Sequence, residues 1–168
     1  KEFALTNKET QNLNAFFLQS TREFLSGEGN QAYSPLSVYI SLSALAECSA
    51  GNTRKEILKL LGADSIESLR SQTHKIWNAH YFSDGNTSCL LANSIWLDRA
   101  CSLSNETAQN LIDHYYTSVF YGDLGTADMN NQLRQWLNSQ TGGFLNSQSK
   151  ELQLHDDTVF SIASTLIF

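Results

Sequence analysis

Two stretches of strand length carry apolar side chains with little alternation, and they limit most strongly what this chain can fold into. The first is SCLLANSIWL, residues 88–97, and the second is TVFSIASTLIF, residues 158–168. A strand that faces a core on one side alternates apolar and polar residues, whereas a strand buried on both faces is a continuous apolar run. We therefore predict that both stretches are strands buried on both faces.

Helical patterns fill most of the chain before the first of these strands. Thr6-Asn7-Lys8-Glu9 fits a capping box, and the apolar spacing after it predicts a helix over residues 7–26. Thr53-Arg54-Lys55-Glu56 fits another capping box and predicts a helix that ends at Gly62. Apolar residues on one side predict a further helix over residues 66–80.

The segment NQAYSPLS, residues 30–37, contains the only proline of the chain. Ser34 is a favourable N-cap, and Pro35 suits the first helical position because the amide proton that it lacks would have no partner there. The segment therefore predicts the start of a helix that continues to about Gly51.

The remaining elements give the fold class. We expect a helix over residues 104–116, a brief strand at 119–123 and a helix from about residue 129 to 143, before the last strand. Helices come first and strands later, without regular βαβ alternation, so the pattern favours an α+β fold. A chain of 168 residues fits one domain.

Composition excludes some partners. Eleven basic and seventeen acidic residues give a formal charge of −6, which argues against non-specific nucleic-acid binding. The longest apolar runs are too short to span a membrane. Three cysteines cannot all pair within the chain, so a disulfide framework is not expected.

No residue pattern supports an enzyme, a metal site or a cofactor. Ser147 and Lys150 have the spacing of some acyl-transfer enzymes, but the companion motifs are absent and a polar loop is expected. The glycines in residues 27–32 follow a helix instead of a strand, so they indicate a helix-ending turn and not a dinucleotide site. Asp156 and Asp157 are expected in a solvated turn.

The cysteines and histidines do not have the spacing along the chain that is typical of metal ligands. Cys48 has no evident cationic neighbour to stabilise a thiolate, so we expect a small buried apolar side chain. We expect His80 to be partly buried and the other three histidines to face water. These are His74, His114 and His155.

Two triplets, beginning at Asn86 and Asn105, fit the glycosylation sequon. We expect an extracellular or cell-surface location, with which these triplets are compatible. The chain also stops within the apolar run that ends at Phe168, and an uncovered strand there would invite aggregation. We therefore expect a piece of a longer protein.

Five segments in this order resemble the serpin family. They are NQAYSPLS, AGNTRKEILKLLG, LANSIWL, QWLNSQTGGFL and TVFSIASTLIF. Together they extend over almost the whole chain. The chain departs from the family pattern at Cys48-Ser49, where Gly-Ala is usual, and at Ala163-Ser164-Thr165, where Val-Asn-Ala is usual.

The resemblance implies a fold of helices packed on a large mixed β-sheet, of which residues 1–168 are the N-terminal portion. The rest of the same polypeptide, with the reactive-centre loop, lies outside this chain. The implied function is inhibition of a serine protease: the protease cleaves the loop, which then inserts into the sheet as a new strand. Alternatives are a non-inhibitory serpin that acts as a carrier, chaperone or storage protein, and a separate α+β interaction module.

The resemblance also implies a site. Ser34, Pro35, Ser37 and Ser164 are expected near the region where the central strands separate. A serine at position 164 has a shorter reach than the usual asparagine, so the hydrogen bonds there are expected to differ. Some serpins bind sulfated polysaccharide through the fourth helix, but here Arg70 and Lys75 lie beside Glu67 and such a site is not supported.

Overall fold

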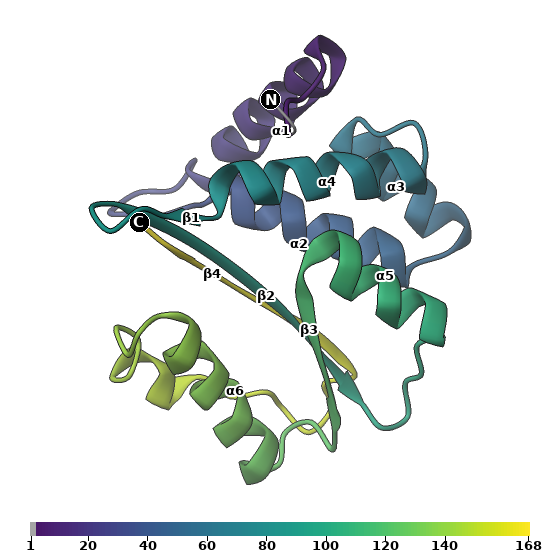
Figure 1. Ribbon diagram of the computed structural model, residues 1–168. Helices are drawn as coiled ribbons and strands as arrows, with labels where there is room; N and C mark the ends of the chain where they lie inside the picture. The colour runs from purple at the N-terminus through teal and green to yellow at the C-terminus, as the bar shows by residue number, and fades with distance from the viewer. Residues whose placement is uncertain (1–2) are drawn as a thin grey trace.

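The computed structural model describes residues 3–168 and shows an α+β fold, as predicted. Figure 1 shows the order of the elements along the chain. The helices are α1 (Asn7–Phe24), α2 (Pro35–Cys48), α3 (Gly51–Leu61), α4 (Ile66–His80), α5 (Asn105–Tyr115) and α6 (Ala127–Gln140), with a short 3-10 helix η1 (Gln148–Glu151). The strands are β1 (Phe82–Ser83), β2 (Ser88–Asp98), β3 (Thr117–Gly122) and β4 (Phe160–Ile167).

The sheet is mixed, and β2 is its central strand. β2 pairs in parallel with β3 and antiparallel with β4, and β1 forms a short antiparallel pair with the start of β2. Asn93 therefore lies opposite Thr117 on one side and opposite Ser164 on the other. Among residues 3–168, the other edge of β4 pairs with no strand.

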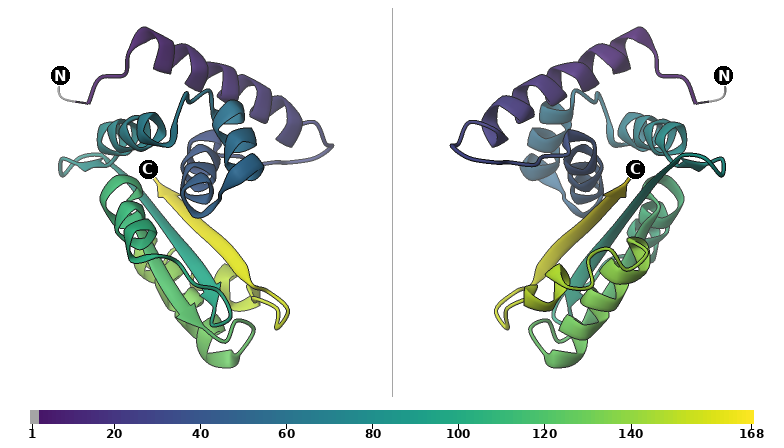
Figure 2. Two further views of the ribbon diagram at one scale, coloured as in Figure 1. Left: turned by 90° about the vertical axis from the view of Figure 1, so that its right-hand side faces the viewer. Right: turned by 90° about the vertical axis from the view of Figure 1, so that its left-hand side faces the viewer.

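Helices cover both faces of this sheet (Figures 1 and 2). Ile95 and Leu97 of β2 pack with Ala44 of α2 and with side chains of α5. Trp96 of β2 lies on the opposite face and packs with α6. Successive residues of a strand point to opposite faces, so the two helical layers bury alternate residues of one continuous apolar run.

The two apolar stretches differ in burial. In β2 the five residues from Asn93 to Leu97 are all buried, which confirms the prediction of a strand covered on both faces. In β4 only Thr165 is buried and the other seven residues are half-buried, so the same prediction was wrong for the second stretch. β4 has one open edge, and side chains at an edge stay accessible to solvent.

One of the two predicted capping boxes is present. Thr6 and Glu9 cap α1 reciprocally, with the Thr6 amide 2.6 Å from the Glu9 carboxylate. The box predicted at Thr53–Glu56 was wrong, because the N-cap of α3 is Ala50, three residues before Thr53, and it has no side-chain bond. The cause lies outside the motif: the Arg54 guanidinium donates to the carbonyl oxygens of Ala46 and Glu47 at the end of α2 and keeps the connection short.

A buried carboxylate joins three helices. Glu47, near the end of α2, is 2% exposed and forms a bidentate pair with Arg70 of α4, with N–O distances of 2.7 and 2.8 Å. Asn110 and Tyr115 of α5 each donate a further bond of 3.1 Å to the same carboxylate. These four residues form the Glu47 cluster. A buried charge is tolerated only when it is paired and hydrogen-bonded, and this one is.

The cluster also determines how Glu47 titrates. Burial alone raises the pKa of a carboxyl group, but the bonds and charge of Arg70, with the bonds from Asn110 and Tyr115, outweigh it and lower the pKa of Glu47 below its ordinary value. A group whose pKa is lowered by folding stabilises the protein at pH values above its unfolded pKa. That contribution is lost as the pH falls through the folded pKa.

We predict that Arg70→Met destabilises the protein by about 3–5 kcal/mol near neutral pH, since it leaves a buried carboxylate without its cation. The deficit should begin to shrink at pH values above about 4.3, the ordinary pKa of glutamate, because burial without the cation raises the pKa of Glu47 in the variant and protonation removes the unpaired charge. It should shrink further below that pH, where the wild type loses the stabilisation that its lowered pKa provides. Urea unfolding at several pH values measures both effects.

The matched control is Lys8→Met, which breaks the exposed ion pair with Asp64. That change should cost less than about 1 kcal/mol. If both variants lose the same free energy of unfolding, burial does not make the Glu47 cluster more important for stability than an exposed ion pair.

Candidate functional site

Hydroxyl groups from α2 and β4 line one groove. Ser34, Ser37 and Ser41, on one side of α2, lie across from Ser164 of β4, and the groove between them has a volume of about 580 Å³. Tyr33 and Leu166 also line it. We call this the serine groove. It contains three of the four site residues expected from the resemblance.

The start of α2 fixes two of these hydroxyls. The Ser34 Oγ accepts the Ser37 amide at 3.2 Å, so Ser34 is the N-cap that the sequence predicted. The two Oγ atoms are also 3.0 Å apart and share a hydrogen bond. Pro35 occupies the first helical position but does not line the groove. Its part is to fix the backbone from which the serines project.

Ser164 belongs to a row of polar residues across the centre of the sheet. Its cross-strand neighbour is Asn93, which is 2% exposed. The Asn93 Oδ1 is buried and has no hydrogen-bond partner in the described part of the chain. The serine therefore does not satisfy the amide beside it, which agrees with its short reach. An unpaired buried acceptor costs about 1–3 kcal/mol.

From the sequence we did not predict Ser41 and Asn93 as residues of the site. Ser41 repeats the helical spacing of Ser34 and Ser37, at i, i+3 and i+7, so the periodicity was available as a signal. Asn93 is a lone amide within the apolar run of β2, where a side chain that needs partners stands out. Neither signal identifies the partner across the groove, because that depends on how β4 packs.

The opposite face of β4 has a groove of its own. Thr141, Phe144 and Leu145, at and beyond the end of α6, face residues 164–168 across it. Phe144 is largely exposed. The two grooves share Ser164, Leu166 and Phe168, so they meet at the end of β4, along its open edge.

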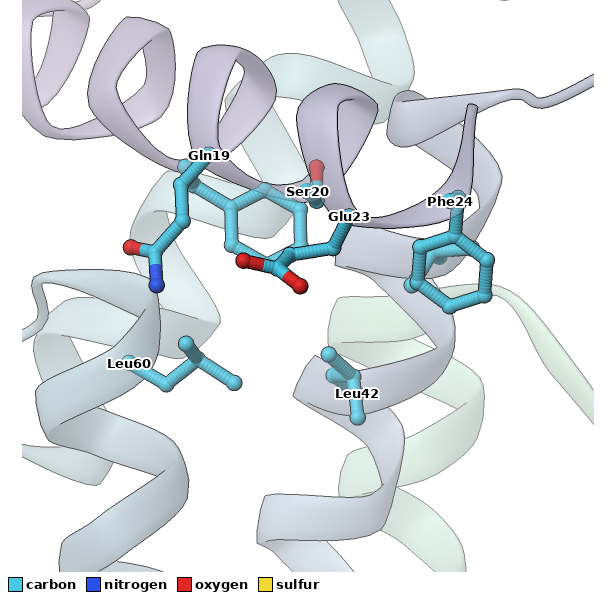
Figure 3. A pocket seen from close by; sticks show the side chains of 8 residues that line it. Gln19, Ser20, Glu23, Phe24, Leu42 and Leu60 are labelled. Atoms are coloured by element: carbon cyan, nitrogen blue, oxygen red, sulfur yellow. The ribbon is translucent and has the colours of Figure 1, made fainter. Parts of the chain in front are cut away.

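A smaller apolar pocket of about 250 Å³ lies between α1, α2 and α3 (Figure 3). Leu42 of α2 and Leu60 of α3 face the side chains of α1 across it. Gln19, Ser20 and Glu23 also line it, and Figure 3 shows the Gln19 amide and the Glu23 carboxylate turned toward the space beside Leu60 and Leu42. Glu23 is the one charged residue among those that line it, so the pocket has too few polar groups to indicate a specific binding site.

The other candidate residues form no reactive group. Ser147 and Lys150 are exposed, and the expected polar loop contains the short helix η1. Cys48 is half-buried, and burial together with the charge of Glu47 raises the pKa of its thiol to about 11, so the thiol stays protonated near neutral pH. Residues 27–32 follow the end of α1, as expected for a helix-ending turn, and Asp156 and Asp157 are exposed in a turn.

Three of the histidine predictions were wrong. His114 of α5, expected to face water, is half-buried. His80 is exposed because it is the last residue of α4, where its ring bonds to the Ile76 carbonyl. His74 is half-buried instead of facing water, because its ring stacks on Tyr116 and its Nδ1 is 2.9 Å from the Tyr116 hydroxyl. Among residues 3–168, no three His, Cys, Asp or Glu side chains are grouped so that they could hold a metal ion.

The cations of α4 that a sulfated polysaccharide would need are already paired within the chain. Arg70 pairs with Glu47, and Lys75 pairs with Glu9 at 3.1 Å. No helix within residues 3–168 has both the length and the apolar character needed to cross a membrane.

Comparison with known sequences gives one family. The sequence profile of the family "Serpin (serine protease inhibitor)" matches residues 11–168. Serpin-ZX of Arabidopsis thaliana is 25% identical over all of this chain and 43% of its own length. Serpin-Z1A of Triticum aestivum is 25% identical over 85% of this chain and 37% of its own length. The chain thus spans less than half the length of these relatives.

Solved structures show the same fold. Arabidopsis AtSerpin1 in its native stressed conformation superposes with a TM-score of 0.79 and 21% identity, covering 97% of this chain and 44% of that protein. The thermophilic serpin tengpin in its latent state gives a TM-score of 0.84 and 22% identity, with 97% and 44% covered. From the profile match over nearly its whole length, together with this fold, the chain belongs to the serpin family.

Proposed function

We propose that the protein to which this chain belongs inhibits a serine protease by trapping it, and that this chain supplies the part of the sheet that receives the inserted loop. The observation that supports this most directly is the open edge of β4, which has a groove on each of its faces. An added strand needs unpaired backbone groups on one strand and room for its side chains on both faces. β4 offers both.

The proposed reaction begins at a loop outside this chain. The protease serine attacks the carbonyl carbon of the scissile bond, the amine leaves with a proton, and an ester joins the loop to the protease. Insertion of the cut loop beside β4 then adds backbone hydrogen bonds and buries apolar area. The protease is moved with the loop and distorted before water can hydrolyse the ester.

The serine groove has a defined part in this proposal. A strand that enters beside β4 changes the surroundings of Ser164, and hydroxyl groups can exchange one partner for another with little change in volume. Ser34 and Ser37 satisfy each other in the absence of that strand. The Asn93 Oδ1 lies one strand away from the entering strand, so its unsatisfied acceptor would gain a bond through the intervening Ser164 hydroxyl if that hydroxyl turns toward it.

We include an extracellular or cell-surface location in the proposal. Both sequon asparagines, Asn86 in the turn before β2 and Asn105 at the start of α5, are exposed and can accept a glycan without repacking. Secretion from a eukaryotic host, followed by enzymatic glycan removal, tests this part: an unchanged mass would count against it.

We predict that the full-length protein forms a complex with a serine protease that survives SDS, because the trapped species is a covalent ester. Gel electrophoresis after incubation with a panel of serine proteases is the measurement, and a protease with its catalytic serine replaced is the control. If every protease only cleaves the loop, a non-inhibitory role as a carrier, chaperone or storage protein is favoured instead.

We further predict that cleavage of the loop raises the melting temperature, because the inserted strand adds hydrogen bonds and burial that the intact form lacks. Calorimetry of the intact and cleaved proteins measures the difference. An unchanged melting temperature would mean that no strand is inserted.

Substitution in the serine groove tests its part separately. Ser37→Leu should impair folding or promote premature insertion and polymers, because the larger side chain overfills the groove and removes the partner of Ser34. Ser139→Leu, at an exposed position of α6, is the matched control. Native electrophoresis after mild heating separates polymers from monomer. Wild-type behaviour of Ser37→Leu would show that Ser37 has no part in strand insertion.

A further inference from the structure

The chain folds back along α6 before it enters β4. Residues 146–157, which we call the return segment, begin after the loop that ends α6 and lead to β4. In Figure 1 this segment passes beside α6 on its way to the last strand. Three side chains of α6 hold it there.

These side chains are spaced four residues apart, so they lie on one face of the helix. Asn130 donates to the Leu154 carbonyl at 3.3 Å and accepts the Leu154 amide at 2.6 Å. Arg134 donates to the Leu152 carbonyl at 3.3 Å. Asn138 accepts the Ser149 hydroxyl and donates to the Asn146 side chain, both at 3.3 Å. We call Asn130, Arg134 and Asn138 the polar row.

Asn130 is the strongest member of the polar row. It is 6% exposed, and it bonds both backbone groups of one residue as well as the Gly125 carbonyl, at 3.0 Å. Gly125 itself has φ +90, and a Cβ there would lie 2.5 Å from the Asp156 backbone. The return segment is therefore pressed against the start of α6 where Asn130 holds it.

A different face of α6 packs on the sheet. Met129, Leu133 and Trp136 are buried with Trp96 of β2. At the far end of the helix, Asn138 also accepts the Gly143 amide through its backbone oxygen, at 2.8 Å, which positions the loop that carries Phe144. That loop forms one wall of the groove beside the open edge of β4. Movement of α6 and widening of this groove are therefore linked.

We infer that the polar row makes α6 and the return segment one body, and that Asn130 is a positioning residue which sets how fast a strand can enter beside β4. This rests on the proposed function. An entering strand has to displace the loop wall at the end of α6. While Asn130 holds the return segment to α6, the wall moves only if the whole body moves. Without Asn130, the loop and the return segment yield separately and insertion is faster.

Asn130→Ala in the full-length protein tests this inference, with Gln135→Ala, an exposed position on the same helix, as the matched control. The first measurement is amide exchange in the native state. We expect the amides of residues 152–156 to exchange at least tenfold faster in Asn130→Ala than in wild type, and residues 141–145 to follow. Loss of one net hydrogen bond changes an opening equilibrium by roughly this factor.

The second measurement is the rate of insertion after loop cleavage, with the fraction of protease that becomes trapped. We expect insertion to be several-fold faster in Asn130→Ala and the trapped fraction to be no lower. Arg134→Met should shift the rate less, in the same direction. It removes two exposed bonds, to the Leu152 carbonyl and to the Asn131 side chain, and keeps the apolar stem, so it remains informative if Asn130→Ala folds poorly.

The outcomes separate the inference from the proposed function. Unchanged exchange at residues 152–156 overturns the inference, and so does faster exchange with an unchanged insertion rate, which would make Asn130 only structural. If wild type neither traps a protease nor gains stability on cleavage, the proposed function fails. In that case amide exchange tests only whether α6 and the return segment form one body. If exchange in Asn130→Ala is faster at residues 152–156 but not at residues 141–145, they do not.

Discussion

The pairing of Glu47 with Arg70 is the interaction on which the arrangement of the helices depends. The Glu47 carboxylate lies where α2, α4 and α5 meet. A single residue connects α5 to β3. The directions of the carboxylate's four hydrogen bonds fix these helices relative to one another, which apolar contacts alone would do less strictly. Because α5 connects two parallel strands, the same cluster positions the crossover that parallel pairing requires.

The two sides of β2 differ in kind. Among residues 3–168 both outer strands, β3 and β4, have an edge that pairs with no strand. Side chains of β3 pack in the apolar clusters on both faces of the sheet, whereas hydroxyl groups line the groove beside β4. If apolar side chains lined this groove, only an apolar partner that excludes water from it would stabilise it. Hydroxyl groups can bond to each other, to water or to an incoming strand, so the sheet has more than one acceptable state there.

The sequence predicted elements whose causes are local. Ser34 and Pro35 begin α2 through bonds between neighbouring residues. The apolar composition of β2 is enough to indicate that this strand is buried. The start of α3 could not be predicted, because Arg54 bonds to the preceding helix, and the two-residue strand β1 has too few residues for a pattern. The resemblance, and not spacing, brought Ser164 together with Ser34. The polar row escaped notice because its partners are backbone atoms of a segment without regular structure.

The pairing of β2 with β4 joins residues far apart in sequence, such as Leu90 with Ile167. Closing so long a loop costs entropy before any hydrogen bond repays it, so this pairing belongs to the slow part of folding. During synthesis, β2 leaves the ribosome long before β4 and waits with one edge unpaired. A nascent chain of this kind depends on chaperones or on fast helix docking to keep that edge from other chains.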